Sequence, residues 1–325
     1  MTSSEPDNSI KKLHDTEEVQ TSFLYVLFIS SVAAIGGFLF GFDSGVINGT
    51  VTALGNAFNA SDVASGFNVA SVLLGCAVGA LMAGPISDRF GRKPIMIITA
   101  VIFAISAFGS GISSSSAEFI FYRLIGGLGI GAASVLAPAY IAEVAPAALR
   151  GRLATLQQLA IVLGLFAAFL SNFLIASVSG GAEAMLMLDI AAWRWMFWVE
   201  LLPALLFLVG VIFIPESPRY LVAQGKIEEA RAIFKRIATG VEDEQIEEVK
   251  KSLQGDKKPN IRDLFIEGKK KIHPIIWIGI GLSVFQQFVG INVVFYYGAE
   301  LWQAAGFDES RSLFIILIAG TTNII

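Results

Sequence analysis

The sequence predicts an all-α protein that crosses a membrane several times. Of its 325 residues, 54% are hydrophobic and only 15% are charged, whereas soluble domains average about 25% charged residues. The mean hydropathy is correspondingly high, at +0.68. Seven apolar runs approach or exceed the ~20 residues that a helix needs to cross a ~30 Å hydrocarbon core. These runs lie near residues 23–47, 63–86, 94–112, 119–141, 153–177, 195–214 and 274–301.

The first 22 residues are hydrophilic. Five of them are acidic and two are lysines, and no basic segment precedes a short apolar core, so this stretch is not a cleavable signal peptide. We expect residues 1–22 to form a cytoplasmic N-terminal tail. Cys76, which lies inside an apolar run, is the single cysteine of the sequence. Because there is no second cysteine, an intramolecular disulfide is not possible.

Lys and Arg are distributed unevenly among the segments that join the spans. The tail and residues 87–93, 143–152 and 215–273 together hold 20 of the 23 basic residues, whereas the alternate loops hold only Arg194 and Arg311. Basic residues concentrate on the cytoplasmic side of membrane proteins. We therefore expect the N-terminus and the long segment in the cytoplasm, and a multi-pass protein of the cell (inner or plasma) membrane.

The hydrophilic segment 215–273 separates six spans, within residues 23–214, from a further span. Apolar residues recur at helical spacing along it, which favours two or three short amphipathic helices under the membrane over a solvated linker. These residues are Ile227, Ala230, Ile233, Phe234, Ile237, Ile246, Val249 and Leu253. Six spans, an insert and then more spans are typical of a transporter built from two halves.

The last apolar run is too short to be a span. Residues 312–325 number 14, which is about 21 Å of helix at ~1.5 Å per residue. We therefore expect the chain to be a fragment that stops within its eighth span. Residues 274–325 would then hold the seventh span and part of the eighth, in an incomplete second half.

Asp43 is the most unusual residue of the first span. A carboxylate at bilayer depth costs about 2.5–3.5 kcal/mol even on insertion scales, so it is seldom there without a use. Apart from Arg123 in the fourth span, we expect no charge at comparable depth. An acid and a base alone in an apolar interior indicate a proton site with its counter-ion.

Small residues form a ridge on the first span. The ridge consists of Gly37, Gly41, Gly45 and Gly49, spaced for close packing on a neighbouring helix. At ~100° per residue, Asp43 points roughly away from this ridge. We expect its carboxylate to face a cavity.

The seventh span carries several carboxamides. Gln286, Gln287 and Asn292 lie there, and Gly290 allows the helix to break between them. Gln158 in the fifth span and Asn323 at the chain's end could face the same cavity. Carboxamides donate and accept together, which suits the paired hydroxyls of a sugar; hydrogen bonding between helices is the alternative.

Several separate motifs resemble the sugar porter family of the major facilitator superfamily. They are GPISDRFGRK at residues 84–93, RLIGGLGIG at 123–131, Glu143 with RGR at 150–152, PESPRYL at 215–221, and QQ…GIN…YY between 286 and 297. The resemblance covers almost the whole chain and includes bacterial sugar/proton symporters such as the D-xylose–proton symporters. It implies the major facilitator fold, with twelve spans in two six-helix halves.

The resemblance also implies roles for individual residues. Asp43 matches the proton-accepting carboxylate of proton-coupled members, and Arg123 matches its partner. The sugar-binding positions are Gln158, Gln286, Gln287, Asn292 and Asn323. A cytoplasmic charge network that latches the inner gate is matched by Asp88, Arg89, Arg92, Glu143, Arg150, Glu216 and Arg219.

The expected function is transport of a monosaccharide, a pentose or hexose, by alternating access with proton symport through Asp43. A passive facilitator, a transporter-like sugar sensor and an inactive fragment are the alternatives. An enzyme is not expected, because His14 and His273 lie near no nucleophile or metal-like cluster. We expect no cofactor, no metal and no nucleic acid, and a monomer in the lipid bilayer.

Overall fold

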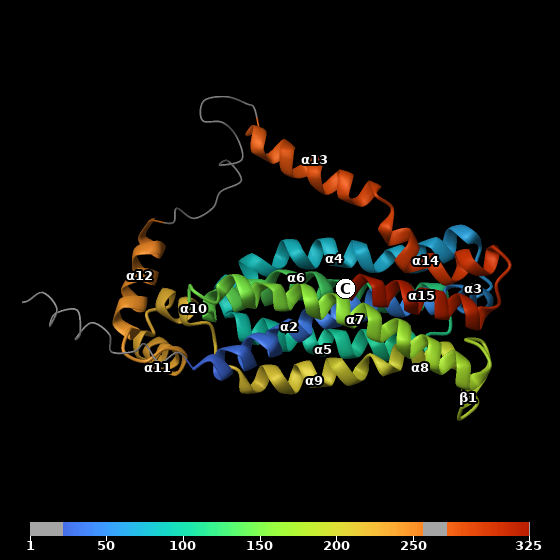
Figure 1. Cartoon of the computed structure of the whole chain (residues 1–325), viewed down its shortest axis with the longest axis horizontal. Coiled ribbons are helices and arrows are strands. Elements are labelled where there is room, and N and C mark those ends of the chain that lie inside the picture. Colours follow the sequence, from blue (N-terminus) through green and yellow to red (C-terminus); the bar gives the residue numbers. More distant parts are fainter. Residues whose placement is uncertain (1–21, 256–271, 325) are drawn as a thin grey trace, which may run out of the picture.

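The computed structural model describes residues 22–255 and 272–324. The predicted tail at residues 1–22 therefore lies almost entirely outside the described residues, as does part of the predicted insert. All seven predicted spans are confirmed as helical segments long and apolar enough to cross a membrane. Figure 1 shows the first six of these segments in a bundle whose long axis is the direction of the helices.

The first five spans are nearly continuous helices. They are α2 (Phe23–Val46), which is extended by the short η1 (Ile47–Gly49), α4 (Asp62–Phe90), α5 (Arg92–Ile112), α6 (Ser116–Val144) and α7 (Arg150–Ser179). Ser61 and Ser115 cap α4 and α6, because each hydroxyl accepts a hydrogen bond from a backbone N–H of the first turn. Gly91, with φ +98°, supplies the sharp turn between α4 and α5.

The sixth and seventh spans are each made of two helices. The sixth consists of α8 (Ala192–Val199) and α9 (Leu201–Phe213), which meet at Glu200. The seventh consists of α13 (Pro274–Phe288) and α14 (Ile291–Ala304), and it breaks at the predicted position, where Gly290 has φ +80°. The last helix, α15 (Glu309–Ile324), begins three residues before the run that the sequence predicted.

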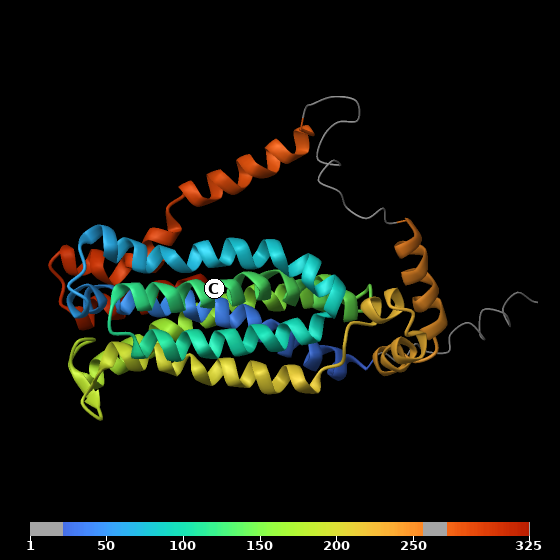
Figure 2. The same ribbon diagram turned by 180° about the vertical axis from the view of Figure 1, so that it is seen from behind.

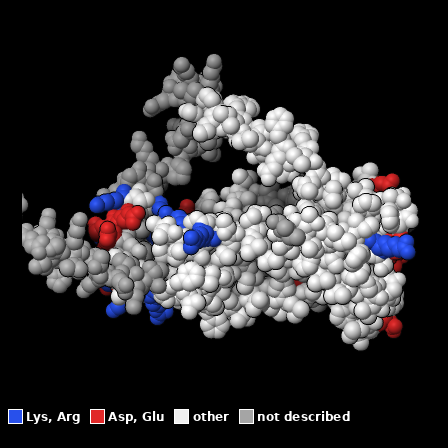
Figure 3. Space-filling model, in the orientation of Figure 1, with Lys and Arg blue, Asp and Glu red and all other residues white. Residues whose placement is uncertain are grey.

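The two ends of the bundle differ. One end, here called the insert end, carries three short helices: α10 (Pro218–Ala223), α11 (Ile227–Ile237) and α12 (Glu242–Gly255). Their apolar stripes pack together around Ala230, Phe234 and Ile246, which confirms the predicted amphipathic helices. On the face drawn in Figure 3, charged residues gather at the two ends and an uncharged band separates them.

The other end, here called the hairpin end, holds two elements that the sequence analysis missed. One is α3 (Val51–Ala57), which lies in a loop that shows no periodic pattern. The other is a two-stranded antiparallel hairpin of β1 (Met185–Met187) and β2 (Ile190–Ala191). Strands this short carry too few residues to show an alternating pattern.

Glycine faces set the closest helix contacts. The predicted ridge on α2 packs against α7: a Cβ on Gly41 would collide with the backbone at Ile161, and one on Gly49 with Asn172. Gly75 and Gly127 approach each other in the same way between α4 and α6. In contrast, α13 leans away from the bundle, as Figure 2 shows, and none of its residues is buried.

Candidate functional site

A buried ion pair joins α2 to α6. The Nη1 group of Arg123 donates a hydrogen bond to Oδ1 of Asp43, and these residues are only 1% and 2% exposed. Asp43 lies six residues before the end of η1 and Arg123 seven residues after the start of α6, so both are about 10 Å inside the hairpin end. The expectation that Asp43 faces a cavity is wrong, because its carboxylate is enclosed against Arg123.

The pair is incompletely satisfied. Within the described part of the chain, Oδ2 of Asp43 and the Nε and Nη2 groups of Arg123 are buried and have no hydrogen-bond partner. The guanidinium also lies 5.8 Å from the centre of the Phe197 ring, close enough for a cation–π contact. Unpaired polar atoms next to a buried charge are costly, so small changes in this arrangement can alter its stability strongly.

A second buried carboxylate, Glu200, lies close to this pair. It is 2% exposed, and Asp43 and Arg123 are near enough to influence its carboxyl group electrostatically. Glu200 is eight residues into the sixth span, about 12 Å from its start, and therefore lies at nearly the depth of the ion pair. The expectation that Arg123 is the only other deep charge is wrong. The sequence already indicates this residue, because Glu200 is a carboxylate inside the apolar run 195–214.

The structure brings together only two of the five carboxamides that the resemblance assigns to sugar binding. Nδ2 of Asn292 donates a hydrogen bond to Oε1 of Gln287 at 2.6 Å, across the helix break at Gly290. The other three, Gln158, Gln286 and Asn323, are exposed on three separate helices. Gln157, which precedes Gln158, is the buried glutamine of α7 and lies against Gly37.

At the hairpin end, Asn48 joins the first span to the seventh. Its Nδ2 group donates to the carbonyl of Phe295 at 2.8 Å, and its Oδ1 accepts from the N–H of Ala299 at 3.1 Å. These two backbone groups are the i and i+4 partners of one helical turn, so one side chain grips that turn of α14. Tyr296 and Tyr297 pack against the same apolar cluster as Phe42. The two spans are therefore closely packed at this end.

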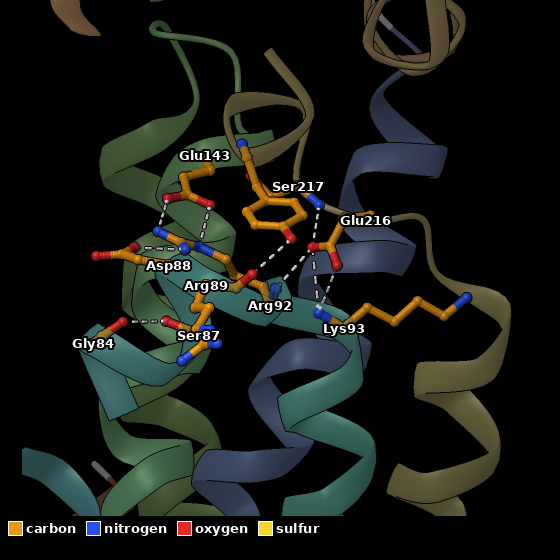
Figure 4. Close-up of polar contacts among 10 residues, drawn as sticks. Gly84, Ser87, Asp88, Arg89, Arg92, Lys93, Glu143, Glu216 and Ser217 are labelled. Carbon is orange, nitrogen blue, oxygen red and sulfur yellow. Dashed lines mark hydrogen bonds and ion pairs between the residues drawn. The ribbon is translucent and has the colours of Figure 1, made fainter. Parts of the chain in front are cut away.

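At the insert end, Arg92 is the centre of a charge network, shown in Figure 4. Its Nε and Nη2 groups donate to the two oxygens of Glu143 at 3.1 and 2.9 Å, and its Nη1 donates to Asp88 at 2.7 Å. This bidentate geometry is the strong form of an Arg–carboxylate pair. The network ties the end of α4 and the start of α5 to the end of α6.

Glu216 acts in this network as a helix cap. Its Oε1 accepts hydrogen bonds from the backbone N–H groups of Arg92 at 2.9 Å and Lys93 at 3.3 Å (Figure 4). These are the first residues of α5, whose N–H groups lack helical partners and carry partial positive charge. Glu216 thus attaches the segment after the sixth span to the start of the third.

The remaining predicted network residues occupy the rim of this region. The carbonyl of Arg89 accepts a hydrogen bond from the hydroxyl of Tyr220, and its guanidinium lies over the Phe90 ring. Arg150 and Arg219 line a cavity of about 320 Å³ together with Glu143 and the helices of the insert. Across residues 22–255 and 272–324, no group of three His, Cys, Asp or Glu side chains is placed to hold a metal ion.

Comparison with known proteins gives consistent matches. The sequence model of the family described as "Sugar (and other) transporter" matches residues 29–325. The chain is 54% identical over 302 residues to a glucose transport protein of Synechocystis sp.. This match covers 93% of this chain and 64% of that protein. It is 41% identical over 327 residues to the D-xylose-proton symporter of Escherichia coli K12, and this match covers 92% of this chain and 65% of the symporter.

A solved structure has the same fold over the same region. It is the proton:xylose symporter XylE bound to 6-bromo-6-deoxy-D-glucose, which matches with a TM-score of 0.80 and 39% identity over 93% of this chain and 67% of that one. The chain thus spans slightly less than two thirds of the length of the two curated relatives.

Proposed function

The chain belongs to the sugar transporter family, and from this membership and the buried site we propose that the complete protein carries a monosaccharide across the membrane in symport with protons. The relatives named as a glucose transport protein and a D-xylose-proton symporter support a hexose or pentose as substrate. The insert end is the cytoplasmic end in this proposal, because it carries most of the basic residues.

The buried ion pair is the observation that carries proton coupling. Asp43 and Arg123 come from different helices and are nearly inaccessible, and three of their polar atoms have no partner among the described residues. Protonation would neutralise Asp43 and release Arg123, so the free energy of enclosing this site would depend on whether a proton is bound. Glu200, a second buried carboxylate within electrostatic range of Arg123, could then pair with the released guanidinium.

Alternating access would use the contacts at the two ends in turn. Asn48 closes the hairpin end by holding α14, while the Arg92 network and the Glu216 cap join the helices at the insert end. In this scheme, the sugar binds between the two ends. Gln158, Gln286, Gln287, Asn292 and Asn323 then supply hydrogen bonds to the sugar hydroxyls, and the helix break at Gly290 lets α13 and α14 move separately.

The test is Asp43→Asn in the complete protein encoded by the gene, reconstituted in proteoliposomes. We expect accumulation of sugar against its gradient to be lost, whereas exchange of labelled for unlabelled sugar persists, because Asn keeps the shape of Asp but takes up no proton. Asp189→Asn, the same change at an exposed hairpin turn, is the matched control and should accumulate sugar as the wild type does.

Three results would contradict parts of the proposal. Uphill accumulation by the Asp43→Asn protein would remove Asp43 as the coupling site. Wild-type sugar uptake that does not make the external medium more alkaline would identify a passive facilitator instead. An absence of both uptake and exchange in the wild type would leave the sugar sensor as the better function.

A further inference from the structure

A groove lined by apolar side chains opens on the outer surface of the helix bundle. Its volume is about 440 Å³, and α2 forms its floor while α7 and the sixth span form its walls. Phe38 and Phe42 contribute to the floor, Leu159 and Leu163 to one wall, and Leu202 and Leu206 to the other. Ser31 supplies the only hydroxyl among the lining side chains.

The groove lies at the depth of lipid acyl chains. At ~1.5 Å per residue, Leu156 and Leu163 are about 9 and 20 Å from the start of α7, and Leu206 is about 10 Å from the end of α9. Both of these helix termini are at the insert end. The groove therefore lies in the hydrocarbon of the leaflet on that side and reaches towards the middle of the bilayer.

Water is a poor occupant of this space. A buried water needs two to four polar partners, and the lining offers one hydroxyl. An empty groove would forfeit dispersion contacts along both walls. A hydrocarbon chain fills the groove without either cost, and the surrounding bilayer supplies it.

A positive charge lies at the mouth of the groove. Arg152 is exposed in the first turn of α7, and the spacing to Leu156, Leu159 and Leu163 places all four residues on one face of that helix. No described residue forms an ion pair with the Arg152 guanidinium. We propose that the groove binds one acyl chain of an anionic phospholipid from the leaflet at the insert end, with the lipid phosphate on Arg152.

The position of the groove gives this lipid a structural role. Phe42, at its inner end, is next to Asp43 in the chain and is itself buried. The bound acyl chain would therefore cover the first span as far as the residue next to the buried Asp43. The inference rests on the protein's residence in a membrane and does not depend on transport activity.

Native mass spectrometry tests the site on protein released from nanodiscs of equal parts phosphatidylglycerol and phosphatidylcholine. The wild type should retain one phosphatidylglycerol. Ala160→Trp, which fills the groove, should retain none. Leu174→Trp lies on the same face of α7, about four turns nearer the hairpin end and outside the groove, and should retain it. Arg152→Gln should keep a lipid but lower the preference for phosphatidylglycerol about fivefold, the factor expected for one basic residue at an anionic surface.

Photo-crosslinking in the unmodified protein gives an independent test that needs no variant to fold. Phosphatidylglycerol with a diazirine in the middle of one acyl chain should label groove residues such as Leu159 and Leu202 in preference to Leu174. Retention of lipid by a folded Ala160→Trp protein would overturn the proposal. So would wild-type protein without a preferred headgroup, or labelling spread evenly over the lipid-exposed side chains.

Discussion

Arg123 and Arg92 both pair with a carboxylate from another helix, but their surroundings are opposite. Arg92 is at the insert end, its side chain is 13% exposed, and three of its nitrogens donate to Glu143 and Asp88. Arg123 is 1% exposed within the bundle, and two of its nitrogens have no partner in the described part of the chain. Within the described residues, the same ionic group is well satisfied where it is partly exposed and poorly satisfied where it is buried.

This difference indicates different uses. A well-satisfied network at a helix boundary fixes the positions of α4, α5 and α6. Each additional hydrogen bond stabilises this network further. An under-satisfied buried pair stores a large electrostatic free energy that protonation or movement can release. The first arrangement suits a latch, and the second suits a site that changes its charge during a cycle.

Removal of the buried cation should have the largest effect. Arg123→Gln leaves Asp43 and Glu200 buried without a counter-ion, and we expect it to lower the free energy of unfolding by about 3–5 kcal/mol. The double variant Asp43→Asn with Arg123→Gln should recover most of that loss. Thermal unfolding of the purified proteins in one detergent measures both changes, and equal instability of the single and double variants would show that the pair is not the source.

An intermediate effect is expected at the insert end. Arg92→Gln removes charge-assisted hydrogen bonds from a partly exposed site, so the loss of unfolding free energy should be about 1–2 kcal/mol. Salt sharpens the comparison, because the Debye length falls to about 3 Å at 1 M. In 1 M salt, the difference in unfolding free energy between Arg92→Gln and the wild type should become smaller. The corresponding difference between Arg123→Gln and the wild type should stay the same. The same salt dependence in both variants would contradict the distinction between a partly exposed network at Arg92 and a buried pair at Arg123.

The smallest effect should come from the helix cap. Glu216→Gln keeps a carbonyl oxygen for the N–H groups of Arg92 and Lys93 but loses the charge that favours a helix N-terminus, at a cost of about 0.3–1 kcal/mol. Glu216→Ala loses the acceptor as well and should be destabilised further. The difference between the unfolding midpoints of the two variants measures the contribution of the hydrogen-bond acceptor. Identical midpoints would show that hydrogen bonding at this cap has no net effect on stability.

Periodicity was sufficient for the long helices and insufficient for short elements. The seven spans and the amphipathic helices of the insert follow from runs of apolar residues, and the break at Gly290 follows from a glycine within a polar stretch. α3 and the β1–β2 hairpin are too short to carry a period. Glu200 was missed although it is visible in the sequence, since the same rule that singled out Asp43 applies to any carboxylate in an apolar run.

The sequence by itself determined that the chain is a helical membrane protein, where its spans lie, and that Asp43 and Arg123 need a reason to be inside it. Only the tertiary structure decided that these two residues pair, that Glu200 lies close to them, and that Asn48 grips α14. The physical reason is that burial and helix period are properties of one segment, readable from its residues. Pairing depends on how helices far apart in the sequence rotate and approach each other, and the glycine faces of α2, α4 and α6 set that approach.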